Sequence, residues 1–118
     1  MESPEVIRAT LAQAIGTTQY WKAYPNLLLT DGVKLMAEMC GAYWLIDEVF
    51  FLLHNEKLKG EEFIVFQLVV KDSSATIRAE DGNKHLLAKQ NIPFTDFPLT
   101  EGITLFWTDN VLMLPTEY

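Results

Sequence analysis

The sequence contains few of the residue types on which catalytic and metal sites depend. Among 118 residues there are one cysteine, Cys40, and two histidines, His54 and His85. A single cysteine excludes an intramolecular disulfide, and two distant histidines without a cysteine pair do not match the ligand spacing of zinc sites. The sequence also has no glycine-rich phosphate loop and no nucleophile elbow. We therefore expect a non-enzymatic protein without metal ion or cofactor.

Basic residues are scarce as well. The chain has 9 Lys and Arg against 16 Asp and Glu, which gives a net charge of −7 at pH 7, and no segment gathers the basic residues. Such a chain lacks the positive surface that holds phosphate backbones or anionic lipid. The composition therefore predicts no direct binding to nucleic acid or to a membrane.

Long apolar runs are missing. The longest covers residues 49–53, whereas a membrane-spanning helix needs about 20 apolar residues. Residues 1–5 have neither the basic region nor the apolar run of a signal peptide. Together with the lone cysteine, these absences predict a cytoplasmic protein.

The residues that are present suit a folded core, because 49% are hydrophobic and 21% are charged. Two N-terminal segments have helical periodicity. Ser3 and Pro4 are typical of the start of the first helix. Thr30 or Asp31 begins a second and longer helix, whose apolar periodicity continues to about Leu53.

The spacing of the apolar residues is no longer helical after a polar connector at residues 55–60. Residues 61–71, EEFIVFQLVVK, have apolar side chains at nearly every position and predict a central strand covered on both faces or nearly so. Tight turns are predicted at residues 81–83 and 109–110. Four further strands are predicted, at residues 75–80, 84–90, 103–108 and 111–114.

The predicted order is thus two helices followed by about five strands. Short connections between strands favour antiparallel neighbours. The expected fold is α+β, with two N-terminal helices, the second long, packed on one face of an antiparallel sheet of about five strands. Because the sequence has no linker or repeat, residues 1–118 are expected to form a single domain.

Asp47 is the most informative polar residue of the second helix. A helical wheel at about 100° per residue places Asp47 on the buried side with Tyr43. The same side contains Met36, Cys40, Phe50, Phe51 and His54. These residues do not form a nucleophilic triad, since ~21 Å of helix axis separates Cys40 from His54.

Three interpretations of Asp47 stay open. The carboxylate is a structural hydrogen-bond acceptor, or it lies at the bottom of an aromatic ligand pocket, or it is partly exposed near the helix end. The donors considered for the structural role are Tyr20, Trp21, Trp107 and the turn at Thr95. Asp96 either converges on Asp47 or orders its own turn between two phenylalanines.

Aromatic residues gather before the second helix and at the end of the sequence. Tyr20, Trp21, Tyr24 and Tyr118 can form an interaction surface, because exposed aromatic side chains dominate many protein interfaces. The alternative is that the first three cover the edge of the core and that Tyr118 packs back on the domain.

Four segments together resemble a family of small bacterial proteins of unknown function. They are TDGVKLMAEMCGAYWLID (30–47), EDGN (80–83), IPFTDFPL (92–99) and VLMLPTEY (111–118). The family pattern is TDGVK…AYWLxD, DGN, IPxTDFPL and an LPSEY-like ending. The resemblance implies no activity, cofactor or catalytic residue. The positions that belong to the shared family pattern are Tyr43, Trp44, Asp47, Asp96 and Tyr118.

These observations favour a non-enzymatic protein-interaction or regulatory module with an unidentified protein partner. Short edge strands and surface aromatics are also compatible with a homodimer. Two alternatives stay open: a small-molecule binding domain with a pocket between the long helix and the sheet, and an acidic inhibitor of a host defence protein.

Overall fold

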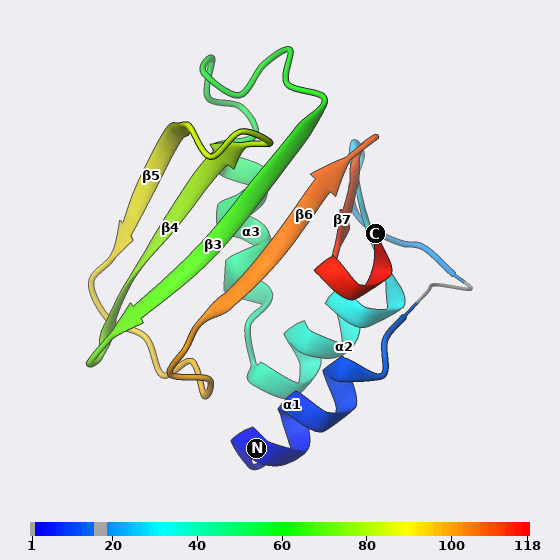
Figure 1. Ribbon diagram of the computed structural model, residues 1–118, viewed down its shortest axis with the longest axis vertical. Coiled ribbons are helices and arrows are strands. Elements are labelled where there is room, and N and C mark those ends of the chain that lie inside the picture. Colours follow the sequence, from blue (N-terminus) through cyan, green and yellow to red (C-terminus); the bar gives the residue numbers. More distant parts are fainter. Residues whose placement is uncertain (1, 16–18) are drawn as a thin grey trace.

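The computed structural model describes residues 2–15 and 19–118, which form an α+β fold (Figure 1). The helices in these residues are α1 (Pro4–Ala12), α2 (Asp31–Cys40), α3 (Tyr43–Leu52) and the short 3-10 helix η1 (Pro115–Glu117). The strands are β1 (Trp21–Tyr24), β2 (Leu27–Leu29), β3 (Phe63–Lys71), β4 (Ser74–Asp81), β5 (Leu86–Ile92), β6 (Ile103–Thr108) and β7 (Val111–Met113).

The seven described strands form one mixed sheet in the order β1-β2-β7-β6-β3-β4-β5. All neighbours are antiparallel except β2 and β7, which are parallel. The prediction of about five antiparallel strands was therefore too low and missed the parallel pair. The two additional strands, β1 and β2, are four and three residues long, too short for an alternating pattern to be recognised.

The predicted long second helix is wrong, because the chain breaks it at Gly41. Gly41 has φ 59° in the left-handed region and ends α2. The N–H of Ala42 donates to the carbonyl of Ala37 (2.8 Å), and that of Gly41 donates to Glu38 (3.4 Å). This pair of bonds is the Schellman arrangement, which stops a helix at a glycine. A new helix, α3, then starts at Tyr43 with a different rotation about its axis.

The helices pack on one face of the sheet and leave the other face uncovered, as the prediction of one-sided packing stated. In Figure 1 the strands β3, β4 and β6 lie in front of α3. The expectation that β3 is covered on both faces is wrong. Ile64, Phe66 and Leu68 are buried against the helices, whereas Val65 is half-buried and Val69 is exposed. A strand with apolar side chains at nearly every position has the composition of a doubly covered strand, although only one side of β3 meets the helices.

Residue Glu117 of η1 binds the start of α2. Its Oε1 accepts hydrogen bonds from the Thr30 hydroxyl (2.6 Å) and the Leu114 N–H (2.9 Å), and its Oε2 accepts one from the Gly32 N–H (3.1 Å). A Cβ on Gly32 would lie 2.6 Å from Glu117 Oε1, so any larger residue here would have to displace the Glu117 carboxylate. The TDG and LPTEY segments are therefore in contact.

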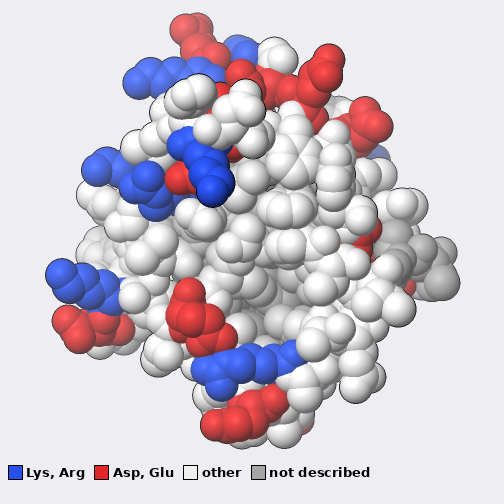
Figure 2. All heavy atoms as spheres, viewed as in Figure 1, with Lys and Arg blue, Asp and Glu red and all other residues white. Residues whose placement is uncertain are grey.

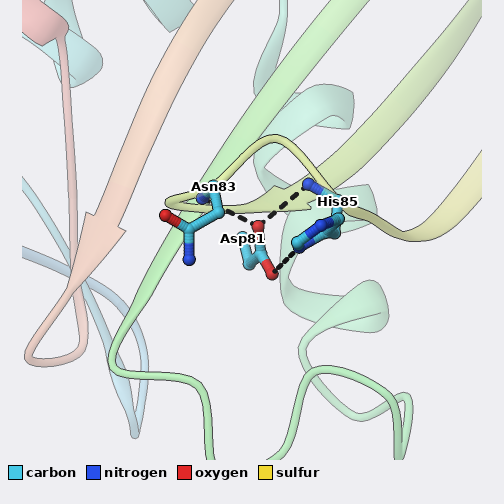
Figure 3. Close-up of polar contacts among 3 residues, drawn as sticks. All are labelled: Asp81, Asn83 and His85. Carbon is cyan, nitrogen blue, oxygen red and sulfur yellow. Dashed lines mark hydrogen bonds and ion pairs between the residues drawn. The ribbon is translucent and has the colours of Figure 1, made fainter.

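The β4–β5 hairpin is confirmed, and its turn is ordered by Asp81 (Figure 3). Asp81 Oδ1 accepts hydrogen bonds from the backbone N–H groups of Asn83 (2.8 Å) and His85 (2.9 Å). The His85 ring Nδ1 lies 3.1 Å from Asp81 Oδ2. These contacts, above all the His85 N–H, lower the pKa of Asp81. The EDGN segment therefore has a structural role in this turn.

Candidate functional site

Four of the residues singled out in the sequence line one groove of about 400 Å³ between the edge strand β1 and the helices. Trp21 and Tyr24 come from β1, and Tyr43 and Asp47 come from α3. Lys34 of α2 lines the groove beside Trp21. Asp96 is not among its lining residues. It lies exposed in the loop after β5, where the Thr95 hydroxyl accepts the Phe97 N–H (3.1 Å) and orders the turn.

An irregularity in β1 directs both of its aromatic side chains toward the helices. Residues three apart in a regular strand point to opposite faces of the sheet. The register of β1 against β2 shifts between Lys22 and Tyr24, as in a β-bulge. As a result the Trp21 indole N–H donates to Asp31 Oδ1 (2.9 Å), and the Tyr24 hydroxyl donates to Asp47 Oδ1.

Asp47 is exposed, so its predicted place on the buried side of a long helix is wrong. The break at Gly41 rotates α3, and the residues that α3 buries are Leu45, Ile46, Val49 and Leu52. The donor to Asp47 is Tyr24, which was not among the donors considered from the sequence. The hydrogen bond to Asp47 is the main cause that raises the pKa of the Tyr24 hydroxyl.

The Tyr24 ring is itself held by stacking. It lies parallel to the Phe50 ring, with centroids 3.8 Å apart and an interplanar angle of 7°. Phe50 in turn meets the His54 ring edge to face at 4.7 Å. The tyrosine that binds Asp47 is therefore fixed by α3 at two points, its ring and its hydroxyl.

The groove already contains one positive charge. The Lys34 Nζ lies 4.4 Å from the centroid of the Trp21 ring, a cation–π geometry. Lys34 also donates to Glu38, and this bond is the main cause that raises the pKa of Lys34. A basic group thus lies against an aromatic wall of the groove.

The uncovered side of the sheet, called the open sheet face below, presents an apolar band. Register places its side chains on the same side of β3, β6 and β7, since Val65 pairs with Phe106 and Phe106 pairs with Met113. Tyr118 packs onto this band, with ring centroids 5.2 Å from Phe63 and 5.7 Å from Phe106. The band consists of Phe63, Val65, Phe106, Met113 and Tyr118, and the polar pair Gln67 and Thr104 separates it from Val69 further along β3.

Charged side chains lie mainly around the edge of this face. Figure 2 shows an uncharged central region with acidic and basic residues interspersed around it. Arg78, Glu80 and Lys89 lie on the β4–β5 side, where Arg78 and Glu80 form an ion pair at 3.4 Å. The view therefore gives no support to an acidic patch that imitates nucleic acid on this face.

The remaining candidates from the sequence do not form a catalytic group. Cys40 is buried, and burial raises the pKa of its thiol to about 11, so the reactive thiolate is suppressed. Tyr20 is exposed beside β1 and is not among the groove residues. Within residues 2–15 and 19–118, no three His, Cys, Asp or Glu side chains gather in a way that could hold a metal ion.

A second hollow of about 310 Å³ lies near the end of α3, lined in part by Phe50, His54 and Trp107. The indole nitrogen of Trp107 is buried and has no hydrogen-bond partner in the described part of the chain. The volume is at the lower limit of typical ligand pockets. This hollow does not include Asp47 or Tyr43, which line the groove beside β1 instead.

Comparisons with known proteins identify a family for this chain. A family model described as a family of unknown function, DUF6876, matches residues 5–118. No curated protein matches the chain. No solved structure matches it either. None of the helices that the structure describes is long and apolar enough to cross a membrane.

Proposed function

The chain belongs to the family of unknown function DUF6876, and from its surface we propose that it is a non-enzymatic protein-interaction module that assembles through the open sheet face. The supporting observation is the apolar band on that face. Monomeric proteins rarely leave a large contiguous apolar patch in water, and such patches mark interaction sites. Three aromatic rings of the band, from Phe63, Phe106 and Tyr118, are of the kind that dominates interface energetics.

The occupant that we propose for this face is a second copy of the chain. Two molecules with a net charge of −7 each would repel if their acidic residues met, but the centre of this face is uncharged (Figure 2). Two sheets can pack face to face with their side chains interdigitated.

Substitution of Val69 by lysine tests the proposal. Val69 lies on the open sheet face, on the same side of β3 as Phe63 and Val65, and is 47% exposed, so lysine is tolerated in the free chain. Val6 on α1 is 45% exposed and provides a matched control. We expect a wild-type dimer by analytical ultracentrifugation, with Val69→Lys raising the dimer dissociation constant about tenfold or more and Val6→Lys leaving it unchanged.

Melting temperatures of both variants establish that any loss of dimer does not come from unfolding. A wild-type chain that sediments as a monomer throughout the micromolar range would overturn the proposal. Equal weakening by Val6→Lys and Val69→Lys would also overturn it, because the interface would then not be specific to the open sheet face.

A further inference from the structure

Helix α3 has an exposed stripe that core packing does not explain. Tyr43, Asp47 and Phe51 follow at four-residue intervals, about 6 Å apart along the helix. The tyrosine is 48% exposed, the phenylalanine is 74% exposed and the aspartate is also exposed. The solvent face of a helix in a globular protein is normally polar. Here two solvated aromatic rings lie one turn before and one turn after a carboxylate.

The carboxylate of Asp47 is held in place and partly available. Its Oδ1 accepts the Tyr24 hydroxyl, while its Oδ2 receives no hydrogen bond from the residues that the structure describes. Asp47 also lies where two depressions of the surface meet. One is the groove with Tyr43, and the other is a shallow hollow of about 280 Å³ with Phe51, Glu48 and Gln90.

A carboxylate between aromatic rings is suited to a cation. Charge-assisted hydrogen bonds to a carboxylate are stronger than neutral ones, and ring faces attract positive groups. The contact of Lys34 with Trp21 shows that a wall of the same groove accepts a cation. The net charge of −7 also steers basic groups towards the protein.

We propose that the stripe formed by Tyr43, Asp47 and Phe51 binds an arginine side chain of a partner protein. Arginine fits better than lysine because its planar guanidinium both stacks on rings and forks onto a carboxylate. The stripe is open to solvent, whereas pockets for small molecules enclose most of their ligand. A side chain presented on a protein surface therefore suits the site better than a free small cation.

This site is independent of self-association through the open sheet face. Helix α3 lies behind β3, β4 and β6 in Figure 1, on the opposite side of the sheet from that face. A chain that is monomeric could still bind arginine, and a dimer could fail to do so. The two experiments therefore succeed or fail separately.

A peptide titration followed by NMR of the full-length chain tests the proposal. The probes are acetyl-Val-Arg-Val-amide, the same peptide with citrulline in place of arginine, and acetyl-arginine-amide. Citrulline keeps the shape of arginine and removes its charge. We expect the arginine peptide to bind about tenfold more tightly than the citrulline peptide and more tightly than the single amide, with shifts at Tyr43, Asp47 and Phe51.

Variants separate the site from general electrostatic attraction. Asp47→Asn keeps an acceptor for Tyr24 and should weaken arginine-peptide binding about tenfold, and Phe51→Leu should weaken it about threefold. Glu56→Gln removes the same charge from an exposed connector residue and should leave binding unchanged. Equal binding of the citrulline peptide, no effect of Asp47→Asn, or single-amide binding as tight as the peptide would each overturn the proposal.

Discussion

At the scale of single residues, Glu117 makes an unusually large structural contribution for a side chain in a three-residue helix. Its two oxygens accept three hydrogen bonds, two of them from the start of α2. An acidic group is also favoured near a helix N-terminus, where the backbone N–H groups lack internal partners. The LPTEY segment therefore acts through its glutamate on the TDG segment.

Replacement of Glu117 by alanine should lower the free energy of unfolding by about 2 kcal/mol, because it leaves the Thr30 and Gly32 donors without their acceptor. Urea denaturation followed by circular dichroism measures this change. Glu62→Ala is the matched control, since Glu62 is an exposed glutamate and should change stability by less than about 0.5 kcal/mol. Similar midpoints for both variants would contradict the structural role of Glu117.

The ion pair between Arg8 and Glu101 predicts a dependence of stability on pH. Arg8 Nε and Nη2 donate to the two Glu101 oxygens at 2.7 and 2.9 Å, and the contact with Arg8 lowers the pKa of Glu101 from 4.5 to about 2. A carboxyl whose pKa is lower in the folded state stabilises the fold above its unfolded pKa. This contribution is lost as the pH falls from 4.5 towards 2.

Denaturation of wild type and Glu101→Gln at a series of pH values measures this contribution. The difference in unfolding free energy between the two proteins should be largest at neutral pH and should shrink as the pH falls from 4.5 towards 2. The pair is solvent-exposed, so the effect should also decrease with added salt. A difference that is independent of pH would show that the Glu101 charge does not stabilise the fold.

At the scale of secondary-structure elements, Gly41 decides the orientation of the stripe on α3. Its φ of 59° is one that residues with a Cβ rarely adopt. Gly41→Ala should therefore lower the free energy of unfolding by about 1 kcal/mol. Thermal or urea denaturation measures the loss. Gly82→Ala is the control, because an added Cβ there meets only ordinary contact at 3.7 Å from Phe63. Equal effects of the two substitutions would contradict the role assigned to Gly41.

The same elements show what could be predicted from the sequence. The starts of α1 and α2 follow from side-chain caps, and Ser3 and Thr30 do accept the N–H groups of Val6 and Val33 at 3.3 Å. The break at Gly41 was not recognised, because a glycine inside an apolar periodic segment is often tolerated in a helix. That one error placed Asp47 on the wrong face. Its partner Tyr24 was missed because a bulge in a four-residue strand leaves no periodic signal.

At the scale of the whole molecule, the arrangement separates two surfaces of different chemistry. The open sheet face carries the apolar band and is uncharged at its centre, and the helical side carries the stripe of Tyr43, Asp47 and Phe51. One-sided packing of the helices was predicted from the order of the elements. The exposure of the opposite face of the sheet was not predicted. Strand β3 is apolar at nearly every position, and this composition is typical of a strand covered on both faces. If both proposals hold, a dimer would present two arginine-binding stripes.

The parallel pairing of β2 with β7 has a consequence for synthesis of the protein in a cell. The Thr30 hydroxyl and its acceptor Glu117 are 87 residues apart in the chain. At a translation rate of about 5–20 residues per second, roughly 4–17 s pass between the synthesis of these two positions. During that time Leu28 and Leu29 lack the β7 residues with which they pair. The β1–β2 hairpin is therefore expected to complete its folding only after β7 and Glu117 have been synthesised.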